Sequence, residues 1–64
     1  MEKTVKERVQ DEMNELTARA EKLQKFMQGE DFKGLPYAQR RLLGEQFNIM
    51  CSYIDCLMAR LSIM

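Results

Sequence analysis

The chain has 64 residues, of which 45% are hydrophobic and 31% are charged, with ten basic and ten acidic side chains and no histidine. This length allows one small domain with a modest core, and the zero net charge argues against binding to nucleic acid polymers by bulk electrostatic attraction. Two cysteines and no histidine offer neither a disulfide framework nor a structural zinc site, so oligomerisation is the remaining common route to a stable fold.

Neither end of the sequence resembles a membrane segment. The first residues contain no apolar run of the kind found in a signal peptide. The apolar-rich stretch over residues 47–64 is interrupted by Asn48, Ser52, Asp55, Arg60 and Ser62, which makes it too polar to span a bilayer. We therefore expect a cytoplasmic protein with no membrane partner.

The first predicted element is an amphipathic helix over residues 5–28. Thr4 and Glu7 form a capping box, in which the hydroxyl accepts from the amide of Glu7 and the carboxylate reaches back. The apolar residues then follow steps of four and three, which is the heptad spacing of a narrow helix-packing seam. They are Val9, Met13, Leu16, Ala20, Leu23 and Met27.

Residues 29–35 are predicted to form a loop. Gly29 suits the end of the first helix, and Gly34 with Leu35 and Pro36 indicates the start of a second, because proline is tolerated in a first helical turn. Phe32 and Leu35 are expected to fold inward and close the end of the molecule. An exposed hydrophobic hot spot in the loop is the alternative.

A second helix is predicted over residues 36–62. Its own heptad seam consists of Leu43, Phe47, Met50, Ile54, Leu57, Leu61 and Met64. A further set of apolar residues accompanies this seam: Leu42, Ile49 and Tyr53, with Cys51, Cys56 and Met58 nearby. The second helix therefore has more apolar surface than one partner helix can cover.

The short connection predicts an all-α fold, an antiparallel two-helix hairpin. Pairing about the loop places Ala20 near Phe47, Leu16 near Met50 and Met13 near Ile54. Gly44 interrupts the second helix at a cost of about 1 kcal/mol relative to alanine. A close backbone crossing near Ala18 or Ala20 would explain it, and a kink is the other possibility.

The uncovered apolar residues predict self-association into a helical-bundle homo-oligomer, either a four-helix bundle or a larger ring. Burial of a few hundred Å² at about 25 cal/mol per Å² would contribute several kcal/mol, comparable to the stability of the whole fold. The predicted interface residues are Leu42, Ile49, Tyr53 and Met58. A different protein covering the same surface is the alternative.

No catalytic or metal site is expected. Without histidine the commonest general base and metal ligand is missing. Cys51 and Cys56 are five residues apart and point about 140° away from each other on a helix, so they cannot share a metal. Ser52 and Asp55 lack a base. We therefore predict a protein that is not an enzyme and has no cofactor.

One cluster has the character of a ligand site: Lys33, Tyr37, Arg40 and Arg41. A helix N-terminus offers free amides and a positive dipole end, which suit phosphate. Arginines add bidentate donors, and a tyrosine ring can stack on a base. The cluster predicts a phosphate- and base-binding site, repeated by symmetry in an oligomer. The alternative is a group of ordinary solvated side chains at a helix start.

Phe26, Phe32, Tyr53 and Arg60, with the spacing of the positions around them, carry most of a resemblance to a known family. The chain resembles a family of small phage and prophage proteins related to a crAss-like phage gene product. The other matching positions are Glu7, Arg8, Glu12, Leu16, Lys22, Leu23, Met27, Leu35, Gln39, Arg40, Leu42, Leu43, Gln46, Met50, Leu57 and Leu61.

The size, the hairpin layout and the apolar second helix are also similar to phage anti-CBASS and anti-Thoeris sponge proteins. This second resemblance implies an oligomer that traps a nucleotide immune signal, such as a cyclic nucleotide, in host cytoplasm, and it carries over no binding residues. An interaction protein that inhibits or adapts a host protein is the competing hypothesis. A purely structural assembly role is the third.

Overall fold

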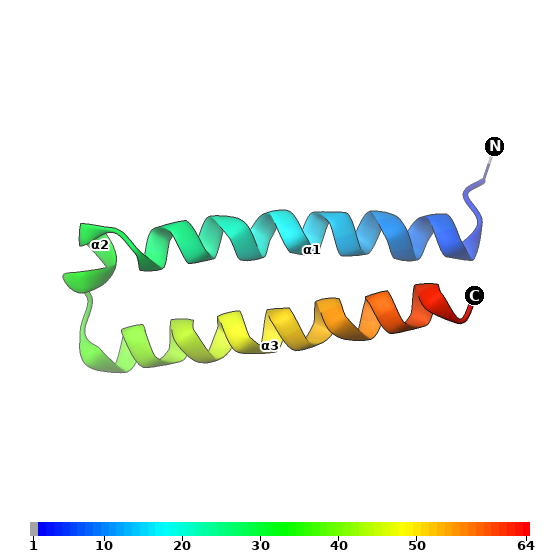
Figure 1. The fold of residues 1–64 in the computed structure, drawn as a ribbon. Coiled ribbons are helices and arrows are strands. Elements are labelled where there is room, and N and C mark those ends of the chain that lie inside the picture. Colours follow the sequence, from blue (N-terminus) through cyan, green and yellow to red (C-terminus); the bar gives the residue numbers. More distant parts are fainter. Residues whose placement is uncertain (1) are drawn as a thin grey trace.

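A computed structural model describes residues 2–64 as two long antiparallel helices joined at one end by a short third helix (Figure 1). Helix α1 spans Val5–Met27, α2 spans Glu30–Lys33 and α3 spans Tyr37–Ser62, with no strand in the described part of the chain. The start of α1 and the end of α3 lie at the same, open end (Figure 1). The prediction of an all-helical fold with two long helices packed together is confirmed.

The N-terminus of α1 is held by its cap residue. Thr4 has an extended backbone, and its Oγ1 accepts a hydrogen bond from the amide of Glu7 at 3.1 Å. The same hydroxyl donates to Oε1 of Glu7 at 3.2 Å, so the carboxylate bonds to the side chain of Thr4. An N-cap of this kind typically stabilises a helix by about 1 kcal/mol. The cap therefore fixes where α1 begins.

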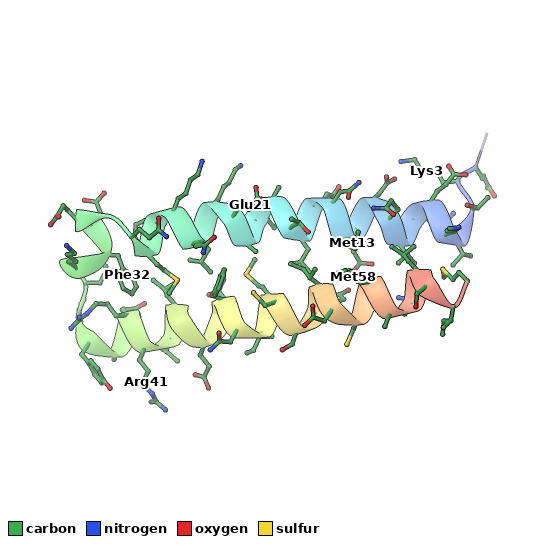
Figure 2. The ribbon with its side chains drawn as sticks, in the orientation of Figure 1. Lys3, Met13, Glu21, Phe32, Arg41 and Met58 are labelled. Carbon is green, nitrogen blue, oxygen red and sulfur yellow. The ribbon has the colours of Figure 1, made fainter. Side chains whose placement is uncertain are left out.

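The connection contains a helical turn in the segment predicted as a loop. Gly29 has an extended backbone, with φ −94° and ψ 172°, and α2 follows it directly. The rings of Phe26 and Phe32 meet edge to face, with their centroids 6.2 Å apart. Phe32 and Leu35 are half-buried, and Phe32 lies at the closed end of the hairpin (Figure 2). The loop prediction was wrong for Glu30–Lys33, a helix too short to show any periodicity.

Helix α3 begins after Pro36, which serves as its N-cap. The carbonyl oxygen of Pro36 accepts from the amides of Gln39 at 3.0 Å and Arg40 at 3.1 Å. No side chain caps this end. Pro36 thus lies immediately before the first turn of α3, whereas the sequence analysis places it within that turn.

The core of the hairpin is the seam between α1 and α3. All six predicted seam residues of α1 are buried or half-buried, and of the seven predicted for the second helix only Met64, which follows the end of α3, is exposed. However, only Val9, Ala20 and Leu57 are fully buried among the described residues, and Leu57 alone is 0% exposed. Two helices form a single layer, so most seam side chains are covered on one side and remain partly open on the other.

Gly44 does not mark a close crossing of the two helices. Helix α3 continues through this position. Apart from its own helix and its chain neighbours, a Cβ atom at Gly44 would meet only the Cε of Met27, at 3.9 Å. This is an ordinary van der Waals separation, so the predicted crossing near Ala18 or Ala20 was wrong.

Gly44→Ala is expected to stabilise the fold by about 0.5–1 kcal/mol, because it removes the entropic cost of a glycine within a helix and meets no steric barrier. Chemical unfolding followed by circular dichroism measures this change. Ala18→Gly, at an exposed position within α1, is the matched control and should cost a similar amount. A destabilising Gly44→Ala would mean that the space beside Gly44 is needed.

Candidate functional site

The predicted ligand residues lie at the closed end of the hairpin, on α2 and the first turns of α3. Lys33 is the last residue of α2, and Tyr37 is the first residue of α3. Arg40 and Arg41 follow one turn later. Helical geometry places Arg40 about 60° to one side of Tyr37 and Arg41 about 40° to the other. The structure therefore gathers Tyr37 and the two arginines on one side of α3.

The two arginines are available for a ligand. The Cζ of Arg40 lies 5.9 Å from the centroid of the Tyr37 ring, within cation–π range. Arg41 points away from α1 (Figure 2). Neither arginine has an ion-pair partner among residues 2–64. Tyr37 is 72% exposed, so its outer ring face is open for stacking.

Lys33 differs from the other three residues. Its ammonium group donates to Oε1 of Glu30 at 3.4 Å, one turn earlier in α2. Both side chains are largely exposed, so this pair is weak and an anionic ligand could displace it. Lys33 therefore adds a positive charge to the group formed by Tyr37, Arg40 and Arg41.

The site is an open surface in the single chain. No pocket is present in the described part of the molecule. Small ligands bind most strongly in concave sites that remove them from water. Any tight ligand would therefore need groups from a second chain or a movement of the side chains at this corner.

The four predicted interface residues are all exposed, but they do not share one side of α3. Ile49 is 64% exposed and Met58 is 55% exposed. Nine residues separate them, which is about two and a half turns of helix. Met58 therefore lies on the opposite side of α3 from Ile49, whereas Leu42 and Tyr53 lie within about 40° of Ile49. An interface that includes all four residues would therefore have to contact two sides of α3, and the prediction for Met58 stays a prediction.

Tyr53 makes the one hydrogen bond between side chains of α1 and α3 in the described residues, in which its hydroxyl donates to the carboxylate of Glu12. This bond raises the pKa of the Tyr53 phenol above its ordinary value, and partial burial adds to the effect. Glu12 had no predicted role in the fold. The predicted pairing of Met13 with Ile54 sets Glu12 level with Asp55, less than one helical turn from Tyr53 along the axis, so the hairpin register gave only an approximate signal.

Other chemistry is sparse in residues 2–64. The thiols of Cys51 and Cys56 are free. No group of three or more metal-ligating side chains converges in this part of the chain. None of its helices combines the length and the apolar character needed to cross a membrane.

Comparison with known proteins identifies a family. The family model described as Sequestin matches residues 3–63, nearly the whole chain. The chain therefore belongs to the Sequestin family. Comparison with curated proteins and with solved structures gave no significant match. The resemblance to the crAss-like phage family is untested by these comparisons and stays a prediction.

The bond between Tyr53 and Glu12 predicts a pKa change. In a Tyr37→Phe background Tyr53 is the only tyrosine, and Glu12→Ala should lower its pKa towards the ordinary value of about 10. Because the folded-state pKa is raised, the bond stabilises the hairpin at neutral pH, and this stabilisation is lost as the pH rises through that pKa.

Ultraviolet absorbance of the phenolate measures the titration midpoint. Tyr53→Phe in the same background should abolish the absorbance change and serves as the control. Equal midpoints with and without Glu12 would show that the hydrogen bond does not persist in solution.

Proposed function

We propose that this chain is a non-enzymatic binding protein that sequesters a small nucleotide signal, and that a phage encodes it to counter host immune signalling. The observation that carries the proposal is the match to the Sequestin family, whose name denotes sequestration. The cationic and aromatic corner at Tyr37, Arg40 and Arg41 supplies the chemistry for a ligand of this class.

A nucleotide signal fits this corner because it combines a phosphate with a flat base. Arginine forms paired hydrogen bonds to phosphate oxygens, and an exposed tyrosine ring stacks on any base. The guanidinium of Arg40 beside the Tyr37 ring brings both kinds of contact within the reach of one nucleotide. The net charge of zero fits a small anion better than a long polyanion, which requires extended basic surface.

Sequestration requires affinity and no turnover. The sequence has no histidine, and the proposed site contains no nucleophile paired with a base. We therefore propose that the ligand leaves the protein unchanged and that no cofactor takes part. The resemblance to phage sponge proteins supports action in host cytoplasm, and it supports a homo-oligomer that presents several copies of the site.

Isothermal titration against cyclic dinucleotides, cyclic trinucleotides and ADP-ribose derivatives tests the proposal. At least one member of the panel should bind, and Arg40→Ala with Arg41→Ala should weaken that binding at least tenfold, since a hydrogen bond to a charged group contributes about 1.5–3 kcal/mol. Arg8→Ala, an exposed arginine near the start of α1, is the matched control and should bind as the natural protein does.

Two results would overturn the proposal. One is the absence of binding heat with every compound of the panel. The other is recovery of a chemically altered nucleotide after the protein is denatured, because this would indicate catalysis. Chromatography of the released ligand distinguishes altered from intact nucleotide.

The second candidate function is binding to a host protein, which the protein would inhibit or adapt. The exposed apolar side chains of α3, Ile49 and Leu42 among them, favour it because surfaces of this kind mark interfaces. Affinity capture from host lysate should then recover a stoichiometric partner that an Ile49→Glu variant loses. Recovery of the protein alone would count against this alternative.

A further inference from the structure

The exposed apolar side chains of α3 form a line along one side of the helix. Leu42, Ile49, Cys56 and Ile63 follow one another at intervals of seven residues, so they drift by only about 20° per step around the helix. All four are exposed in the single chain. Tyr53 lies beside this line, about 40° from Ile49. A heptad line is the pattern with which one helix packs along another.

The bond between Tyr53 and Glu12 identifies the side of α1 that continues this surface. Because the two side chains meet, the Glu12 side of α1 and the Tyr53 side of α3 lie on the same face of the hairpin. Val5 is seven residues before Glu12 and Phe26 is fourteen after it, so both lie within about 40° of it. We call this surface the apolar face. Its large hydrophobic side chains are Val5, Phe26, Leu42, Ile49, Tyr53 and Ile63, all of them exposed.

The area and the charges of the apolar face indicate which partner covers it. The hairpin measures 46 × 21 × 14 Å, so its broad side is on the order of 1,000 Å², enough for the roughly 800 Å² per partner of a standard interface. The charges on the α1 side of this face are balanced and thus complementary to a copy of themselves. They are Arg8, Glu12, Glu15 and Arg19. Helix α3 adds one charge of each sign to the face, Glu45 about 40° from Ile49 and Arg60 in line with Leu42.

We propose that a second copy of this chain covers the apolar face, with α3 against α3 at the centre and the charged side of α1 at the rim. This inference rests on the proposed function only for the self-association. It specifies the surface through which the chains associate. A hairpin with three fully buried side chains gains the core that it lacks. Protein–protein interfaces usually have an apolar centre surrounded by a polar rim.

The same geometry separates assembly from ligand binding. Arg40 lies about 160–180° around α3 from Leu42 and Ile49, and Tyr37 lies about 120–140° from them. Two hairpins joined through the apolar face therefore leave Tyr37 and Arg40 of both corners uncovered, whereas Arg41, about 80–100° from Ile49 and Leu42, lies nearer the edge of that face. Each corner then binds its ligand outside this interface, through a movement of its own side chains, and loss of ligand binding does not entail loss of assembly.

Analytical ultracentrifugation of the full chain tests the inference with two matched variants. Ile49→Glu places a charge within the apolar face, and Met58→Glu places one on the opposite side of the same helix at similar exposure. The natural protein and Met58→Glu should sediment as the same oligomer, while Ile49→Glu should fall to a lower subunit number. A monomeric natural protein, or equal dissociation of both variants, would overturn the inference.

Thiol labelling of the natural protein decides the question even if Ile49→Glu fails to fold. Cys56 is the more exposed cysteine in the single chain, and Cys51 is half-buried on the other side of α3. A second copy on the apolar face covers Cys56, so Cys51 should react first with iodoacetamide, as mapped by mass spectrometry. Faster labelling of Cys56 would overturn the inference.

These outcomes are distinct from failure of the proposed function. A monomer that binds a nucleotide would overturn only the interface. An oligomer that binds no compound of the nucleotide panel would overturn only the ligand assignment.

Discussion

The packing of one helix against one other helix is the constraint on which the rest of this structure depends. A two-helix hairpin has a single seam, and here that seam fully buries only Val9, Ala20 and Leu57 among the described residues. Hydrophobic burial is the main favourable term in folding, and it must offset the conformational entropy of the whole chain. Under the proposed self-association, the apolar side chains outside the seam form a second seam between two chains.

The proposed separation of the assembly surface from the ligand site follows from the directions in which the side chains of α3 point around the helix axis. Its seam side faces α1, one flank carries the apolar face, and its first turns present Tyr37 and Arg40 on the other flank, with Arg41 pointing away from α1 (Figure 2). A cationic corner far from an apolar interface keeps its charges hydrated until a ligand arrives. Because that corner has no pocket in the described residues, its affinity for a ligand depends on paired hydrogen bonds from arginine and on stacking. Removing either arginine should therefore affect the ligand and leave the assembly intact.

The sequence predicted the features that arise from periodicity and missed those that arise from single contacts. Steps of four and three identified both sides of the seam. Helix α2 was missed because four residues carry no period and the contact of Phe26 with Phe32 is made in space. Met58 was grouped with Ile49 because both are apolar, although counting turns along α3 places the two residues on opposite sides of the helix. The candidate site was predicted from residue type alone, because no motif specifies its ligand. The contact between Arg40 and the ring of Tyr37 is seen only in the structure.

Thermal unfolding at several protein concentrations tests most directly the claim that this hairpin depends on a second copy. If folding and association are coupled, the midpoint temperature rises with concentration by mass action, and helicity falls on dilution together with the subunit number. Circular dichroism from the low micromolar range upwards measures this dependence. We predict a midpoint that increases steadily with concentration. A midpoint independent of concentration would contradict the account, because it would show that the single seam between α1 and α3 suffices.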